Sequence, residues 1–71
     1  MKLKYRQFTG SIEYSDDDCI WYGQVLTYNN KPVKDLINYH SYTKDKLFHE
    51  FKMSVIEYVK FCHELGKKVG N

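Results

Sequence analysis

The sequence DLINYHSYTKDKLFHEFKMSVIEYVKFCHELGKK, residues 35–68, decides the fold of this chain. Within it, apolar side chains recur at the spacing of an α-helix and form a stripe about 120° wide. A stripe of this width is stable only when it packs against another apolar surface, and the preceding half of the chain is long enough to supply one. The stripe comprises Leu47, Phe48, Phe51, Val55, Tyr58, Val59, Cys62 and Leu65.

The residues at both ends of this predicted helix match the usual capping preferences. Thr43 has the hydroxyl favoured at a helix N-cap, and Asp45 places negative charge near the positive end of the helix dipole. Gly66 is well placed to end the helix because glycine adopts the left-handed conformation at little cost. The sequence therefore predicts one long helix that ends at Leu65.

Three strands are predicted before the helix, and together they give the order β-β-β-α. Residues 8–14 alternate between core-facing and outward positions, residues 20–28 are rich in aromatic and branched side chains, and about residues 34–40 form a third strand with Ile37 and Tyr39 inward. Turn-forming residues separate the first two strands at 15–18, and the sequence NNKP at 29–32 precedes the third. Gly23 predicts a bulge or a close approach of another backbone. We therefore expect one α+β domain over residues 1–71, with a three-stranded antiparallel sheet on one long helix.

Composition places the chain among small globular proteins. Its 71 residues include 17% aromatic side chains, which argues against disorder, and its net charge of +2 is too weak to favour direct nucleic-acid binding. Two cysteines far apart in the sequence do not form a disulfide framework, which indicates a reducing compartment. We find neither the apolar segment of a signal peptide nor an apolar run long enough for a membrane span. We therefore expect a soluble, cytoplasmic protein.

The residues that could carry out catalysis are poorly arranged for it. His49 and His63 are fourteen residues apart, or about 21 Å along a helix, and cannot share a metal ion. Cys62 belongs to the core stripe, and Cys19 follows Asp16–Asp18, whose negative charge does not favour a reactive thiolate. The sequence also lacks a glycine-rich phosphate loop, a C-x-x-C pair and an H-E-x-x-H motif. We therefore expect no enzymatic activity, no metal and no cofactor.

Two apolar residues lie outside the core stripe. Met53 and Ile56 fall roughly opposite its centre, close to His49 and Lys60 on the helical wheel. Single exposed apolar residues are ordinary, whereas neighbours at i and i+3 are also typical of an interface. Both interpretations remain open at this stage.

Four segments in order resemble the HicB-type antitoxin domain of bacterial toxin–antitoxin systems. KYRQFTGSIEY at 4–14 resembles the family's first strand, and WYGQVL at 21–26 resembles its second strand. DLINYHSYTKDKL at 35–47 and FKMSVIEYVKFCHELGK at 51–67 are similar to the segments that follow. The chain departs from the family pattern at Ser41, where the family has glycine, at Ile56, where it has an acidic residue, and through about five extra residues around 28–34. The resemblance nevertheless spans almost the whole chain.

The resemblance implies a fold, a partner and an assembly. The fold is a three-stranded antiparallel sheet backed by one helix, often with a short last strand, described as partial RNase H-like. Members of the family bind and occlude a small RNA-cleaving toxin, and many self-associate through this domain. Full-length antitoxins usually carry a DNA-binding domain, which would begin where this sequence reaches Asn71. We accordingly expect a HicB-like protein without that domain, and a homodimer formed through an edge strand or the Met53/Ile56 face.

These expectations lead to one principal hypothesis and two alternatives. The principal hypothesis is a non-catalytic antitoxin that occludes a small RNase toxin, and the first alternative is a phage or mobile-element inhibitor of a host defence nuclease, similar to an anti-CRISPR protein. The weaker alternative is a small nucleic-acid-binding protein that uses Lys2, Lys4, Arg6, Lys67 and Lys68. The residues expected to bind the protein partner lie in the acidic turn, the following loop and the outward helix face: Asp16, Asp17, Asp18, Tyr28, Asn29, Asn30, Lys31, His49, Met53, Ile56 and Lys60.

Overall fold

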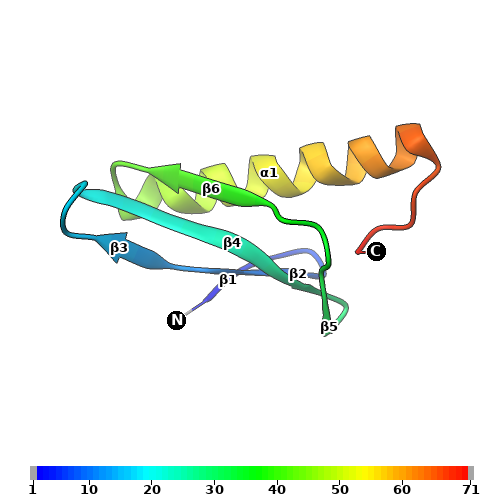
Figure 1. Ribbon diagram of the computed structural model, residues 1–71, viewed down its shortest axis with the longest axis horizontal. Coiled ribbons are helices and arrows are strands. Elements are labelled where there is room, and N and C mark those ends of the chain that lie inside the picture. The colour runs from blue at the N-terminus through cyan, green and yellow to red at the C-terminus, as the bar shows by residue number, and fades with distance from the viewer. Residues whose placement is uncertain (1, 71) are drawn as a thin grey trace.

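A sheet and a single helix form the two layers of the chain (Figure 1). The computed structural model describes residues 2–70, so the predicted domain boundaries at residues 1 and 71 lie outside the described residues. The α+β class is confirmed, whereas the prediction of only three strands is wrong. The elements are β1 (Lys2–Tyr5), β2 (Phe8–Ser11), β3 (Glu13–Ser15), β4 (Ile20–Tyr28), β5 (Lys31–Pro32), β6 (Asn38–Ser41) and α1 (Lys44–Leu65).

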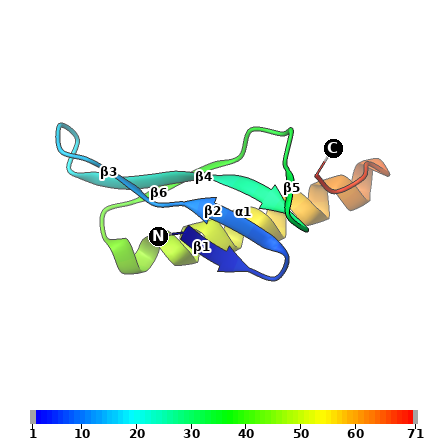
Figure 2. The same ribbon diagram turned by 90° about the horizontal axis from the view of Figure 1, so that it is seen from below.

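Strand β4 is the centre of the sheet, and every pairing is antiparallel (Figure 2). Along one edge β4 pairs with β2 and then β3, and along the other edge it pairs with β6 and β5. β2 and β3 correspond to the predicted first strand, which breaks at Ile12. Strand β1 pairs outside β2 and was not predicted, although Leu3 and Tyr5 alternate with lysines and pack against the core.

The third predicted strand is shorter than expected. It begins at Asn38 as β6 rather than near Lys34, and residues 33–37 form a loop. The backbone N–H of Val25 still donates to the carbonyl of Ile37 at 2.9 Å, so the loop joins the sheet edge just before β6. The inward orientation of Tyr39 is confirmed, since only 4% of its surface is exposed.

Gly23 lies where another backbone approaches β4 closely, as one of its two predicted roles requires. A Cβ at this position would overlap the Ser11 carbonyl oxygen and would lie 2.9 Å from a ring carbon of Tyr39. The alternative role, a bulge, is found elsewhere: the register between β2 and β4 shifts between Thr9 and Gly10. Glycine at 23 therefore allows β4 to contact its neighbours without a side chain between them.

Both predicted caps of α1 are confirmed. The side-chain oxygen of Thr43 accepts a hydrogen bond from the backbone N–H of Lys46 at 3.2 Å. At the other end Gly66 has a φ of 67°, in the left-handed region, and the next residue, Lys67, donates its N–H to the Cys62 carbonyl at 2.8 Å. This geometry turns the chain away from the helix axis and back toward the sheet.

The buried face of α1 is narrower than the predicted stripe. The sheet covers its centre, where the buried residues are Leu47, Phe51, Val55, Tyr58 and Cys62. Phe48, Val59 and Leu65 were expected in the core but are 41%, 38% and 62% exposed, because they lie at the margins of the stripe or beyond the sheet's cover. A sheet of short strands thus leaves apolar surface uncovered along the helix.

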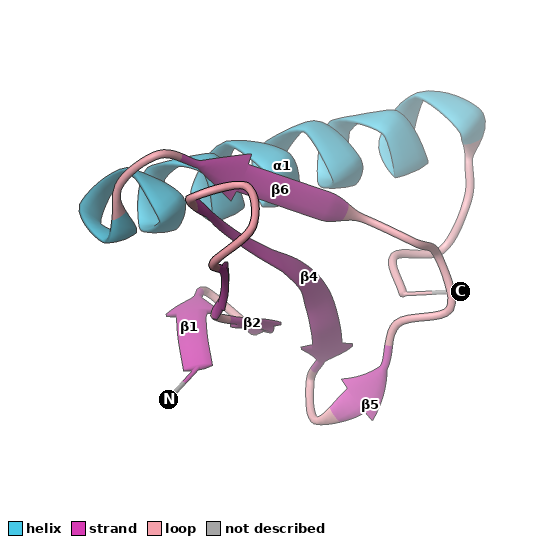
Figure 3. Cartoon of the chain, turned by 60° about the vertical axis from the view of Figure 1, so that its left-hand side comes forward, coloured by secondary structure: helices cyan, strands magenta, loops and turns pink. Residues whose placement is uncertain are grey.

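The C-terminal segment folds back toward the turn between β4 and β5. Within residues 66–70 no strand forms, so the short last strand implied by the family resemblance is not found there. Instead, the Lys34 N–H approaches the Gly70 carbonyl at 3.5 Å, and Figure 3 places this segment beside the loop that joins β5 to β6. Asn29 and Asn30 both have positive φ, 52° and 64°, as a two-residue hairpin turn requires.

Candidate protein-binding groove

The residues predicted to bind a partner occupy three separate surfaces. Asp16–Asp18 lie in the turn between β3 and β4, whereas Tyr28 and Asn29–Lys31 lie at the opposite end of β4. Nine residues of extended strand separate these two turns by about 26 Å. One small partner could not centre its interface on both turns, so the predicted set does not form a single site.

The third surface is the outward face of α1. Met53 and Ile56 are 40% and 39% exposed, which confirms that they lie outside the core. His49 and Lys60 are exposed beside them. Met53 and Ile56 therefore form a small apolar patch within a polar helix face, too limited by themselves to define a binding site.

A more extensive concave surface lies on the side of α1 that faces β6. Two of its apolar residues are strongly exposed: Leu36 by 75% of its surface and Phe61 by 52%. Such exposure is costly in water, and together with the concave shape it is typical of a surface that binds another molecule. We call it the α1–β6 groove, and its lining residues are Asp35, Leu36, Ile37, Asn38, Ser54, Glu57, Tyr58 and Phe61.

Negative charge follows the same side of the helix. Glu57 lines the α1–β6 groove. Glu50 lies seven residues before Glu57, and Glu64 lies seven residues after it. Seven residues are nearly two helical turns, so the three exposed glutamates form a ridge about 21 Å long. Within residues 2–70 the ion pair joins Lys67 to Asp35 and leaves these glutamates unpaired. Lys60 is exposed beside the ridge, three residues after Glu57 and four before Glu64, so the margin of the groove carries more negative than positive charge. The groove therefore combines apolar contact area with a mainly acidic margin.

Sequence reasoning did not identify the α1–β6 groove, although one signal was available. Glu50, Glu57 and Glu64 recur at a constant spacing of seven, a pattern that can be read from the sequence. Leu36 gave no comparable signal, because its exposure depends on residues 33–37 leaving the sheet as a loop rather than continuing the predicted strand. The position of the groove thus follows from the late start of β6.

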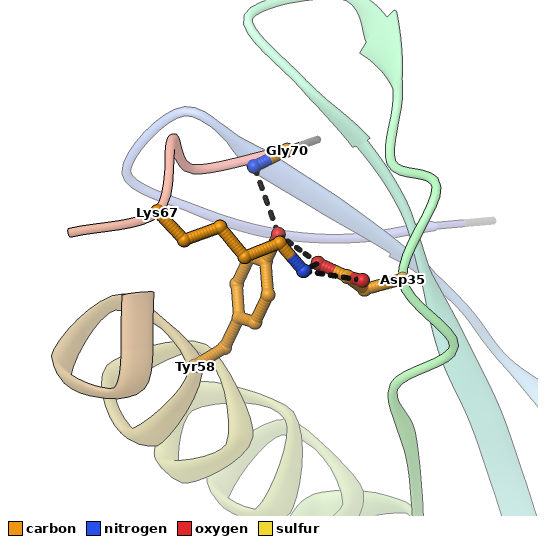
Figure 4. Close-up of polar contacts among 4 residues, drawn as sticks. All are labelled: Asp35, Tyr58, Lys67 and Gly70. Atoms are coloured by element: carbon orange, nitrogen blue, oxygen red, sulfur yellow. Dashed lines mark hydrogen bonds and ion pairs between the residues drawn. The ribbon is translucent and has the colours of Figure 1, made fainter. Parts of the chain in front are cut away.

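A polar network fixes one end of the groove (Figure 4). Lys67 Nζ donates to both carboxylate oxygens of Asp35 at 2.7 Å, and the Tyr58 hydroxyl donates to the same carboxylate at 2.7 Å. The Tyr58 oxygen also accepts the Gly70 N–H at 2.8 Å. These bonds tie the loop before β6 and the C-terminal segment to α1. The Asp35 carboxylate is therefore occupied by internal contacts.

The same contacts shift the ionisation of the network. The hydrogen bonds from Lys67 and then from Tyr58 hold the pKa of Asp35 below its usual value, since both donors favour the carboxylate. Burial, followed by the bond to Asp35, raises the pKa of Tyr58 because both disfavour the phenolate. At neutral pH the network is thus an ionised Asp35–Lys67 pair with a neutral tyrosine.

The remaining reactive side chains lie apart from the groove. Cys62 is buried in the core and Cys19 is exposed in the β3–β4 turn. Among residues 2–70 no three or more His, Cys, Asp and Glu side chains are grouped so that they could hold a metal ion. In the same part of the chain, no helix has the length and apolar character needed to cross a membrane.

Comparison of the chain with protein-family models, with curated proteins and with solved structures gives no match.

Proposed function

We propose that this chain is a non-catalytic, HicB-like protein that binds and occludes a small, basic, RNA-cleaving protein through the α1–β6 groove. The observation that carries the proposal is the combination of exposed Leu36 and Phe61 with the adjacent glutamate ridge. The HicB-like motifs in the sequence support the same class of partner. The partial RNase H-like description, the cytoplasmic location and self-association through an edge strand belong to the same proposal.

The apolar residues would supply most of the affinity. Burying a fully exposed Leu or Phe side chain contributes about 1.5–3 kcal/mol. Since Leu36 is 75% exposed and Phe61 52% exposed, complete burial of both would contribute on the order of 2–4 kcal/mol. Binding energy concentrated in a few central side chains is typical of protein interfaces.

The glutamate ridge would supply orientation and selectivity. Proteins that cleave RNA hold its phosphates with lysine and arginine side chains. The exposed ridge of Glu50, Glu57 and Glu64 presents negative charge over about 21 Å, and such charge attracts a basic surface and speeds association. A protein bound there would have its RNA-binding surface covered, so inhibition needs no chemistry by this chain.

The centre of the proposed interface lies away from the turns at both ends of β4, which the sequence predicted as partner-binding. The acidic turn Asp16–Asp18 and the Asn29–Lys31 turn could contact only the periphery of a partner seated on the groove, since they lie at opposite ends of β4. Ile56 lies about 140° from Phe61 around the helix, whereas Met53 lies beside the ridge, between Glu50 and Glu57. Met53 and Ile56 remain the predicted self-association surface.

The test is complex formation with a small basic RNA-cleaving protein encoded next to this chain. The two proteins should co-elute, and the chain should inhibit cleavage of RNA. Phe61→Ser and Glu57→Lys should weaken both effects by about tenfold or more, because each removes a central contact or reverses its charge. Phe48→Ser and Glu13→Lys are the matched controls, since Phe48 is 41% exposed about 140° from Phe61 around α1 and Glu13 lies in β3.

Two outcomes would overturn the proposal. The first is the absence of a complex with, or of inhibition of, such a neighbour. The second is a complex that the groove variants leave intact and the control variants disrupt. The alternative, inhibition of a host defence nuclease, uses the same groove, and a phage operon around the gene together with binding to that nuclease would favour it.

A further inference from the structure

A second concave site lies on the far side of the polar network, between the β4–β5 turn and the C-terminal segment. It has a volume of about 440 Å³. Three lysines from different segments line it: Lys31 in β5, Lys34 in the next loop and Lys68 after α1. We call it the lysine pocket, and its other lining residues are Tyr28, Asn29, Pro32, Val69 and Gly70.

Among residues 2–70, no acidic side chain in the lysine pocket balances this positive charge. Its lining residues include no aspartate or glutamate. The carboxylate of Asp35 in the adjoining network is neutralised by Lys67, and this is the ion pair found within residues 2–70. Three ammonium groups around one concavity repel one another, so an anion that enters the pocket is bound and also relieves that repulsion.

The backbone around the lysine pocket is held in place before any ligand arrives. Gly70 is fixed from two sides, by its N–H bond to the Tyr58 hydroxyl and by its carbonyl contact with the Lys34 N–H. The Tyr28 ring packs against Phe8, with 4.6 Å between ring centroids. Binding therefore requires ordering of the lysine side chains only, which lowers its entropic cost.

We propose that the lysine pocket binds a phosphate group. A phosphate carries up to two negative charges and several acceptor oxygens, so it can satisfy several lysines at once, whereas a carboxylate carries one charge. The phosphate can belong to a small molecule or to a nucleic-acid strand, because both present the same oxygens. This inference does not depend on the proposed function, since the α1–β6 groove and the lysine pocket are lined by different residues.

The experiment is a titration of isotopically labelled protein with pyrophosphate at low ionic strength, followed by NMR. Backbone amides of residues 31, 34 and 68–70 should shift on binding. Each single change, Lys31→Gln, Lys34→Gln or Lys68→Gln, should weaken the affinity for pyrophosphate about threefold, because an exposed charge pair contributes modestly. The triple variant should weaken it about thirtyfold, because such contributions are nearly additive. The matched control, with Lys→Gln at 4, 46 and 60, removes the same net charge and should keep its affinity within about threefold.

A further variant separates a built pocket from a general effect of charge. Tyr58→Phe retains every lysine but releases the Gly70 N–H, so it should weaken pyrophosphate binding because Gly70 is no longer held in place. Competition by a single-stranded RNA without terminal phosphates would identify the phosphodiester backbone as the source, and lack of competition would identify a small molecule. Equal weakening in the pocket and control triple variants, or no localised shifts in the original protein, would overturn the proposal.

Discussion

Replacing Gly23 by alanine tests the packing that holds the two halves of the sheet together. The new Cβ would overlap the Ser11 carbonyl oxygen and lie 2.9 Å from both the Ser11 carbonyl carbon and a Tyr39 ring carbon. None of these atoms can move freely: the Tyr39 hydroxyl donates to the Ser11 carbonyl at 2.8 Å, and the Gln24 N–H donates to the Ser11 hydroxyl at 2.9 Å. The substitution must therefore push β4 away from the junction of β2 and β3.

The expected loss is large for a domain of this size. Overpacking by a methyl group costs about 1–3 kcal/mol when side chains can adjust, and here the obstacle is backbone, so we expect about 3 kcal/mol. At about 0.05–0.15 kcal/mol per residue, a 71-residue domain has a total stability of about 4–11 kcal/mol. In a domain this small each kcal/mol shifts the Tm by about 4–8 °C, so Gly23→Ala should lower the Tm by about 12–24 °C.

Gly66→Ala is the matched control for this experiment. A Cβ at Gly66 would meet no atom within 4 Å, so the cost there comes from its positive φ alone and should be about 1–2 kcal/mol. Gly23→Ala and Gly66→Ala reduce the conformational entropy of the unfolded chain by the same amount, so this contribution cancels when their Tm values are compared. Thermal unfolding followed by circular dichroism measures the two Tm values. If Gly23→Ala melts no lower than Gly66→Ala, the close approach at Ser11 does not determine stability.

Three further predictions concern ionisation and thiol access. The hydrogen bonds from Lys67 and Tyr58 lower the pKa of Asp35 in the folded state, so its contribution to stability is present above about pH 4 and is lost as the pH falls further. The unfolding midpoints of Asp35→Asn and of the original protein should therefore differ at about pH 6 and converge in acid. Burial raises the pKa of Tyr39 to about 12, so the stability of the folded state should fall as pH rises from about 10 through 12. Unfolding midpoints measured across this range should fall less for Tyr39→Phe than for the original protein. A thiol reagent should label exposed Cys19 in the folded protein and buried Cys62 only after unfolding, as mass spectrometry would detect.

The helix could be predicted from the sequence almost to the residue because its signals are local. Capping by Thr43 and Gly66 depends on neighbours within one helical turn, and periodicity identifies the buried centre of the stripe. Its margins could not be predicted, since the exposure of Phe48 and Val59 depends on how far a sheet of short strands extends across the helix. Periodicity gives the direction of a side chain but not the width of the layer that covers it.

The sheet and the two concave sites depend on contacts between distant segments. Strand β1 was missed because its alternation spans only four residues, and Lys31–Pro32 looked like a breaker although a two-residue pairing with β4 tolerates proline at a sheet edge. Lys34 and Lys68 lie 34 residues apart in sequence and meet only because Gly66 turns the chain back. No local pattern could have placed them in one pocket.

The Asp35–Tyr58–Lys67 network separates two sites of opposite charge. Tyr58 lines the acidic α1–β6 groove with its ring, and its hydroxyl holds Gly70 at the border of the lysine pocket. Asp35 lines the α1–β6 groove, and Lys67 immediately precedes Lys68 of the lysine pocket. Their ion pair neutralises both charges, so the charge of each site comes from its other residues, Glu57 in the groove and the three lysines in the pocket. A single buried tyrosine therefore contributes to both the α1–β6 groove and the border of the lysine pocket.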